Sequence, residues 1–252
     1  MNPYSYDLHV HSCLSPCADD DMTPNNIAGM AALKGLHIVA LTDHNSCKNC
    51  PAFFEACRRQ GIIPVAGMEL STAEDIHLIC LFEQLEQAIA FDAEIATHLM
   101  PIANRKEIFG NQLILDGNDK IVGEESTLLI SATDLWIQDA VELARSFGAH
   151  VRPAHIDRES NGIVSILGDI PLEYGFNCLE FNDVGNVEPY RSQFPLVDTS
   201  TVLVCSDAHH LWDISEAEHA LLLQDEPYSS SLVRQSLFSY LRAPTRFNNG
   251  FI

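Results

Sequence analysis

The segment Asp7-Leu-His-Val-His11 carries side chains of the kind that bind metal ions. It ends a run of strand-forming residues, and side chains alternate between the two faces of a strand. Asp7, His9 and His11 therefore share one face, where two imidazoles two residues apart can hold one cation. We expect Asp7, just behind them, to accept a ring N–H and fix the ring's orientation. An isolated pair of this kind is usually solvent-exposed, but similar residues recur further along the chain.

The recurring residues follow the ends of predicted strands. Strands are expected at 37–42, 62–68, 76–82, 149–154, 177–181 and 201–205, and helices at 25–34, 51–60, 133–148 and 229–241. Strands that alternate with helices favour parallel pairing through helical crossovers. The fold class is therefore α/β, and such folds bind ligands at the carboxyl ends of their strands. His11, His44 and Glu69 all fall at such ends, and His77 lies near the start of its strand.

The region of about 83–133 interrupts this regular order. A helical stretch at 83–99 and a hairpin turning at 116–119 indicate a small inserted α/β elaboration. No linker rich in Gly, Ser or Pro divides the chain. We therefore expect residues 1–252 to form a single domain that carries this elaboration.

Composition bears on the environment and the partners. The formal net charge of −21, from 35 acidic and 14 basic residues, disfavours binding to duplex nucleic acid or anionic lipid. No run of about 18 apolar residues predicts a membrane span, and no secretory signal is visible at the start of the chain. We expect a cytoplasmic protein with neither duplex nucleic acid nor a membrane as a partner, and the sequence leaves the oligomeric state open.

Nine candidate metal ligands lie at strand ends or in the loops that follow them. They are His9, His11, Asp19, His44, Glu69, His77, His155, Asp207 and His209. Imidazole and carboxylate ligands suit zinc, manganese or iron rather than a thiolate site. Nine ligands exceed what one tetrahedral ion needs. We therefore expect two or three divalent ions, with a carboxylate bridging at least one pair.

Five short segments resemble, in order, the motifs of the PHP (polymerase and histidinol phosphatase) family. They are Asp7-Leu-His-Val-His11, Thr42-Asp-His-Asn45, Gly67-Met-Glu-Leu70, Ala154-His-Ile-Asp-Arg158 and Ser206-Asp-Ala-His209. The likeness runs from about residue 5 to 210. It is greatest to the stand-alone branch that cleaves phosphoesters, including nucleoside 3′,5′-bisphosphates and short oligonucleotides. The resemblance implies a distorted (β/α)7 TIM-like barrel with parallel strands and a trinuclear metal centre.

The resemblance also implies which residues hold each ion. One ion takes His9, His11, Glu69 and Asp207, a second shares Glu69 and adds His77 and His155, and a third takes Asp19, His44 and His209. Related proteins read Ser-Asp-Gly after the paired histidines, whereas this chain has the longer Ser15-Pro-Cys-Ala-Asp19. Asp19 is chosen over the two following aspartates by its distance to Thr23-Pro24.

The implied reaction is hydrolysis of a small phosphate ester by a metal-bound hydroxide. The expected partner is thus a small phosphorylated substrate. Arg158 is the candidate phosphate clamp because a guanidinium binds phosphate bidentately, and an ion pair at the barrel rim is the alternative. Asp43 is expected to orient a ligand or to move a proton.

Four cysteines raise a separate hypothesis. Cys13 and Cys17 follow the first strand, and Cys47 and Cys50 follow the second. If the two loops meet, four thiolates would hold zinc or an iron–sulfur cluster, or act as a redox-sensitive dithiol. Free or buried thiols are the alternative.

The predicted function is that of a metal-dependent phosphoesterase. A histidinol-phosphate-type phosphatase and an amidohydrolase-like hydrolase are the competing enzymes. A non-catalytic protein that senses redox state or metal is the competing function from another class. The cysteine quartet favours this regulator, and the complete ligand set favours an enzyme.

Overall fold

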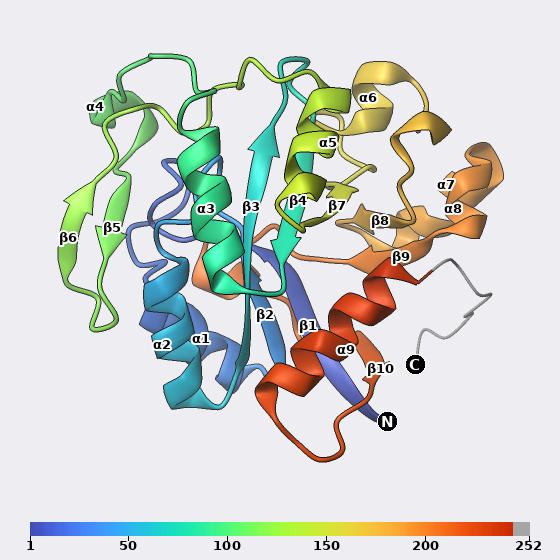
Figure 1. Ribbon diagram of the computed structural model, residues 1–252, viewed down its shortest axis with the longest axis horizontal. Coiled ribbons are helices and arrows are strands. Elements are labelled where there is room, and N and C mark those ends of the chain that lie inside the picture. The colour runs from blue at the N-terminus through green and yellow to red at the C-terminus, as the bar shows by residue number, and fades with distance from the viewer. Residues whose placement is uncertain (244–252) are drawn as a thin grey trace.

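A curled six-stranded sheet forms the centre of the computed structural model, which describes residues 1–243 (Figure 1). Its strand order is β10-β1-β2-β3-β4-β7. The strands are β10 (Ala220–Leu223), β1 (Asn2–Val10), β2 (Ile38–Leu41), β3 (Ile63–Ser71), β4 (His77–Phe82) and β7 (His150–Pro153). A second sheet pairs β8 (Cys178–Phe181) with β9 (Thr201–Val204) in parallel.

Backbone hydrogen bonds connect the two sheets into a distorted barrel. The Ile156 N–H, after β7, donates to Glu180 O at 2.9 Å, and the His11 N–H, after β1, donates to Ala208 O at 3.0 Å. The strands β1, β2, β3, β4, β7, β8 and β9 thus follow one another around the barrel, while β10 pairs with the first half of β1. The predicted α/β fold class, a distorted TIM-like barrel, is confirmed.

The expectation of uniformly parallel strands is wrong for β4. β1, β2 and β3 pair in parallel, but β4 runs antiparallel to both β3 and β7. The physical reason is the length of the connection, because only residues 72–76 link β3 to β4. A parallel crossover needs a dozen or more residues, so this short link forms a hairpin. The start of β4 consequently lies beside the end of β3.

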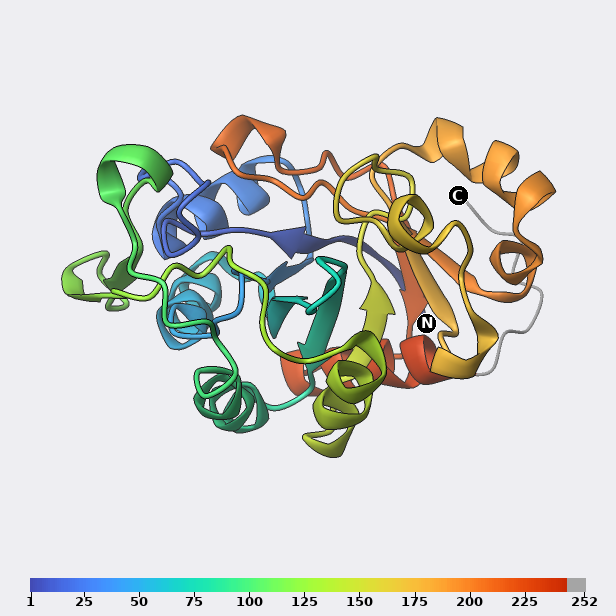
Figure 2. The same cartoon turned by 90° about the horizontal axis from the view of Figure 1, so that it is seen from above.

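Helices cover the outer face of the sheet. These are α1 (Pro24–Leu33), α2 (Cys50–Gln60), α3 (Leu85–Ile95) and α5 (Ile137–Ser146). Figure 2 shows α2, α3 and α5, coloured from blue to yellow-green, in an arc around the outside of the strands. The shorter helices are α4 (Lys106–Phe109), α6 (Ile163–Leu167), η1 (Leu172–Tyr174), η2 (Val184–Asn186), α7 (Val187–Gln193), α8 (Pro195–Thr199) and η3 (Leu211–Asp213).

Helix boundaries follow local sequence where capping residues are present. The Thr23 side chain accepts from Asn26 N–H at the start of α1, and Gly61 ends α2 with a φ of 73°. The helix expected at 133–148 instead begins at Ile137, because Thr133 donates its hydroxyl to the Ser71 carbonyl. The Ile137 N–H at the start of α5 instead donates a hydrogen bond to the Glu74 carboxylate.

The inserted region of about 83–133 contains a helix and a hairpin, as expected. β5 (Leu113–Leu115) pairs with β6 (Ile121–Glu124) in an antiparallel ribbon at the left edge of Figure 1. The turn at 116–119 has the Asp116 N–H donating to Lys120 O. Within residues 1–243, no helix combines the length and the apolar character needed to cross a membrane.

The C-terminal helix α9 (Ser230–Arg242) packs against one end of the barrel. Its Val233 and Leu237 join a buried cluster with Ile63 and Val65 of β3. On the alternating faces of a strand, these two β3 residues lie on the same side as Glu69, but at the opposite end. α9 therefore closes the end of the barrel where β3 begins, and leaves Glu69 at the other end.

Gly67 is packed too closely for any side chain. A Cβ there would lie 2.7 Å from Leu81 Cδ2 and 2.8 Å from Thr42 Cγ2. We expect Gly67→Ala to lower the free energy of unfolding by about 1–3 kcal/mol through overpacking between β2, β3 and β4. Urea unfolding followed by circular dichroism measures this. Gly29→Ala is the matched control, because a Cβ at this α1 position meets nothing within 4 Å, and it should not destabilise the protein. Equal stability of Gly67→Ala and wild type would contradict the packing argument.

Candidate metal centre

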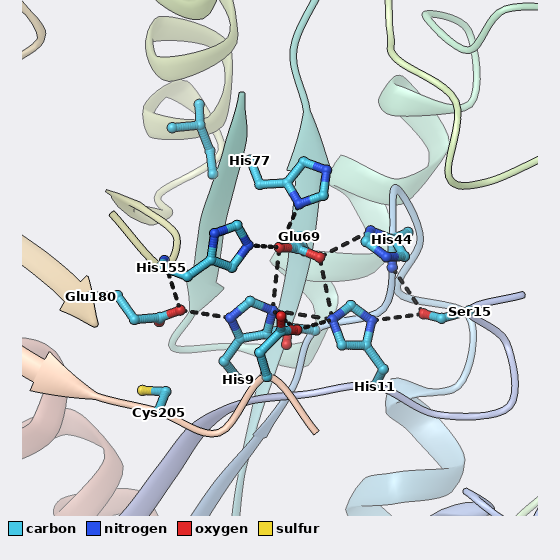
Figure 3. Close-up of polar contacts among 12 residues, drawn as sticks. His9, His11, Ser15, His44, Glu69, His77, His155, Glu180 and Cys205 are labelled. Atoms are coloured by element: carbon cyan, nitrogen blue, oxygen red, sulfur yellow. Dashed lines mark hydrogen bonds and ion pairs between the residues drawn. The ribbon is translucent and has the colours of Figure 1, made fainter. Parts of the chain in front are cut away.

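Four predicted ligands meet in one buried cluster, drawn in Figure 3. His9 Nε2 lies 3.1 Å from His11 Nε2, and both nitrogens lie 3.1 Å from Asp207 Oδ1. Glu69 completes the group, with Oε1 at 3.4 Å from His9 Nε2 and Oε2 at 3.2 Å from His11 Nε2. His9 lies in β1, His11 directly after it, Glu69 in β3, and Asp207 in the loop after β9.

The spacing of these atoms fits a metal ion. Ligand atoms at about 2.0–2.1 Å from a tetrahedral zinc ion are separated by about 3.4 Å along each tetrahedron edge. Within residues 1–243, Glu69 Oε2 and Asp207 Oδ1 are buried and accept no hydrogen bond. Buried carboxylate oxygens require a partner. A bound cation would supply that partner, so the residues present fit a divalent ion.

Glu69 is also the centre of a second group. Its Oε1 lies 2.8 Å from His77 Nδ1 and 3.1 Å from His155 Nε2, and its Oε2 lies 2.9 Å from His44 Nδ1. His44, Glu69 and His77 can jointly hold an ion. Because β4 is antiparallel to β3, its first residue His77 sits diagonally beside Glu69 on the same face (Figure 3).

A third group contains His11, His44 and His209. The resemblance implied Asp19 where the structure instead has His11. The Asp19 side chain is 50% exposed, and its Oδ2 lies 3.7 Å from His210 Nδ1. Only the Asp19 backbone approaches the group, because its N–H donates to His209 O. In the extended loop 12–22, the backbone path directs the Asp19 carboxylate away from His44 and His209.

The pairing of β1 with β2 shifts register between Asp7 and Val10, next to the first two candidate histidines. Asp7 was expected on the same face as His9 and His11, where it would orient an imidazole ring. Asp7 accepts instead from the Ser206 hydroxyl at 2.6 Å and from the Ser215 N–H at 2.9 Å. It therefore fixes the loop that carries Asp207 rather than an imidazole ring.

Glu180 takes the ring-orienting role expected of Asp7. Its Oε1 lies 2.6 Å from His9 Nδ1, and its Oε2 accepts from Arg152 Nε at 2.9 Å and Nη2 at 2.6 Å. All three side chains are fully buried. Sequence reasoning missed this residue because it treated 177–181 only as a strand. The available signal was a lone acid in an apolar strand, which requires a buried partner.

Asp43 orients a second imidazole through a serine. Its Oδ1 accepts from the Ser15 hydroxyl at 2.7 Å, and Ser15 Oγ lies 2.9 Å from His11 Nδ1. Asp43 also accepts from Ser12 N–H and Oγ, each at 2.7 Å. The carboxylate is buried behind His11, so it is placed to hold a ring orientation.

The pKa shifts follow from burial and from the mutual contacts. Burial alone would raise the pKa of Glu69, but His77, His9 and His44 outweigh it and hold the pKa well below its usual range. Burial lowers the pKa of His44 to about 4 and that of His209 to about 3. Neutral imidazole and ionised carboxylate are the forms that bind metal, so Glu69, His44 and His209 are in those forms. At His11, by contrast, burial is outweighed by Asp207 and Glu69, which raise the pKa to about 9.

Strained backbone supports two of the candidate ligands. His155 has a φ of 25° and Asp207 a φ of 55°, in the left-handed region that residues other than glycine rarely adopt. Such strain concentrates at functional sites. Asn45, beside His44, has a φ of 47° and accepts from Ser71 N–H through Oδ1.

Arg158 lies at the rim of the cluster. Its side chain is 44% exposed and its Nη1 pairs with Asp207 Oδ2. This is the ion pair that the sequence offered as the alternative to a phosphate clamp. The exposed guanidinium nevertheless borders the metal centre.

The four cysteines do not form a common site in the part of the chain that is described. Candidate metal groups there contain only His, Glu and Asp, and all four thiols are free. Cys47 and Cys50 belong to the buried apolar cluster beneath the helices, whereas Cys17 is exposed. Burial raises the pKa of the Cys13 thiol to about 12, which disfavours the thiolate. A shared metal site for the quartet is therefore not supported among the described residues, and a redox role of these thiols stays a prediction.

This chain is thus a distorted α/β barrel whose strand ends bring together imidazoles and carboxylates that could hold metal ions. The model of the PHP domain matches residues 7–153, which is more than half of the chain. The chain therefore belongs to the PHP family, and the resemblance seen in its motifs is confirmed.

Solved structures share the fold at low sequence identity. Lesion-specific endonuclease Q from Pyrococcus furiosus is 16% identical with a TM-score of 0.64, over 96% of this chain and 56% of that chain. A candidate metal-dependent phosphoesterase from Bifidobacterium adolescentis is 16% identical with a TM-score of 0.59, over 94% of this chain and 97% of that chain.

A curated relative matches a shorter stretch. An error-prone DNA polymerase from Symbiobacterium thermophilum is 36% identical over 74 residues, which are 29% of this chain and 7% of the polymerase. The chain thus spans little more than half of endonuclease Q and a small part of the polymerase.

The expectation that duplex nucleic acid is excluded as a partner is wrong. Another endonuclease Q structure contains a 27-mer duplex with an abasic lesion at the active site, at 16% identity and a TM-score of 0.61, over 94% of this chain and 57% of that chain. A protein of this fold therefore binds duplex DNA. Net charge describes the whole surface, whereas divalent ions can reverse the field around one site.

Glu180→Gln tests whether the buried Arg152–Glu180–His9 chain orients the metal centre. We expect metal affinity to fall about 10–100-fold, because losing a partner of a ligating histidine typically has that effect. Calorimetric titration with Zn²⁺ or Mn²⁺ measures it, with circular dichroism to verify folding. Glu173→Gln, an exposed residue of η1, is the matched control and should bind metal normally. Unchanged affinity in a folded Glu180→Gln variant would refute the orienting role.

Proposed function

We propose that the chain is a metal-dependent phosphoesterase that hydrolyses a phosphate ester of a nucleotide or oligonucleotide. The observation that carries this proposal is the convergence of six imidazoles and two carboxylates on one end of the barrel. The PHP family and the likeness to proteins named phosphoesterase and endonuclease support it.

The contacts suggest which residues would hold each ion. His9, His11, Glu69 and Asp207 would hold one, and Glu69 would share a second with His77 and His155. A third would lie at His44 and His209. An imidazole nitrogen binds one ion, and His11 Nδ1 faces Ser15, so His11 Nε2 serves the first or the third ion but not both.

The chain's own residues supply orientation around that centre. Divalent ions held there would neutralise phosphate charge and activate water as a nucleophile. Glu180 and the Asp43–Ser15 pair hold the ring orientations of His9 and His11. Arg158, once released from Asp207, would bind a phosphate oxygen at the exposed rim.

We also propose that the region of about 83–133 belongs to the same single domain. Asn45 Nδ2 donates to Leu129 O at 2.7 Å and to Ser131 O at 2.9 Å. These bonds tie the inserted region to the residue that follows His44. The competing regulatory function has less support, because no candidate metal group among residues 1–243 contains a cysteine.

Metal dependence is the first test of the proposal. We expect phosphate release from a nucleoside 3′,5′-bisphosphate, loss of it on chelation, and recovery with Mn²⁺, Zn²⁺ or Fe²⁺. The panel also contains histidinol phosphate, an amide and a duplex with an abasic site, which separates the competing reactions. His9→Ala should abolish turnover, whereas His98→Ala should not, because His98 contacts Asp134 outside the cluster. Full activity of a protein shown to be metal-free would refute the proposal.

The bridging role of Glu69 predicts a difference in metal content. Glu69→Gln should lose more bound metal than His44→Ala. Glu69 contacts His9 of the first proposed ion site and His77 of the second, whereas His44 is assigned to the third site alone. Elemental analysis after anaerobic purification measures the stoichiometry. Asp19→Asn is the control and should retain wild-type content, since its carboxylate is half exposed. Equal metal loss in Glu69→Gln and His44→Ala would argue against a bridge.

A further inference from the structure

A depression at the opposite end of the barrel has no role in the proposed phosphoesterase chemistry. Its volume is about 750 Å³, and it lies where α5, β7 and α9 come together. Polar lining side chains are Gln87, Arg145, His150, Asn177 and Arg242. The volume falls within the range of small-molecule sites.

Two arginines face this depression in a chain with only 14 basic residues. Arg145 Nη2 donates to Gly175 O at 3.0 Å, and no carboxylate among residues 1–243 pairs with it. Arg242 Nη2 donates to Gly148 O at 3.0 Å, and its Nη1 lies 3.5 Å from Glu83 Oε2. Each guanidinium has five N–H donors, so most of these donors remain available to a ligand.

His150 adds a buried polar group to the same lining. Its side chain is 4% exposed, and its Nε2 has no hydrogen-bond partner in the described part of the chain. A buried nitrogen without a hydrogen-bond partner is destabilising, so a native structure needs a reason for it. Burial, followed by the fields of Arg152 and Arg242, lowers the pKa of His150 well below its usual range. The neutral ring has one N–H to donate.

The depression is separate from the metal centre. His150 begins β7, and His155 follows the other end of that strand. Four strand residues span about 10 Å. Arg152, between them, points its guanidinium to Glu180 and Leu8 O rather than into the depression.

We propose that this depression binds a small phosphate-bearing molecule, held by Arg145 and Arg242 with His150 completing the lining. Two guanidinium groups match the charge and the oxygen geometry of a phosphate. The inference does not depend on the proposed catalytic function, because none of the candidate metal ligands lines the depression.

Titration of the ¹⁵N-labelled full chain with inorganic phosphate tests the inference, because each site has its own backbone resonances. We expect saturable shifts of the Gly148, Ala149 and Gly175 amides, whether or not the amides near His209 also respond. Arg145→Gln and Arg242→Gln should each weaken phosphate binding at this site about tenfold or more, since each removes charge-assisted hydrogen bonds. Both side chains are exposed, so we expect these variants to fold.

Arg58→Gln is the matched control. It removes one exposed arginine from the last turn of α2 and should leave the phosphate affinity unchanged. Acetate should bind more weakly than phosphate. The inference is overturned if the three amides show no saturable shift, if Arg58→Gln weakens binding as much as Arg145→Gln, or if acetate binds more tightly than phosphate.

Discussion

The burial of the Glu69 carboxylate is the constraint on which the functional end of this barrel depends. Glu69 is 1% exposed and touches imidazoles from β1 and β4 and from the loops after β2 and β7. An ionised carboxylate is stable in such a place only with close positive partners. The dense packing around Gly67, two residues earlier on β3, therefore controls the position of the group that all these rings share.

The positions of several candidate ligands could be predicted because they lie at or near strand ends. His9 and Glu69 lie near the ends of β1 and β3, His155 follows β7, and the type of side chain indicates metal binding. The antiparallel direction of β4 was also readable in principle, since five residues cannot build a crossover. The inference of uniform strand direction came instead from a general rule for alternating elements, which the local connection length overrides.

Other features depend on contacts between distant segments and were beyond sequence reasoning. The role of Glu180 in orienting the His9 ring becomes visible only when β8 is known to lie beside His9 and Arg152. Asp19 shows the converse, because the course of an irregular loop decides where a carboxylate points. The net charge of the chain was a poor guide to nucleic-acid binding for a similar reason, since a sum over all residues does not describe the electrostatic field at one face of the protein.

The β3–β4 hairpin has a consequence for how the protein assembles. Glu69 and His77 are eight residues apart, and a hairpin of this kind forms early because its contacts are local. His9 and Asp207 come from nearly opposite ends of the described chain, so bringing them together costs more conformational entropy than closing the hairpin. A cation bound by the Glu69–His77 pair and by His9 and Asp207 would bind only the folded barrel and would therefore stabilise it. The supply of metal would then influence how much of the chain is folded.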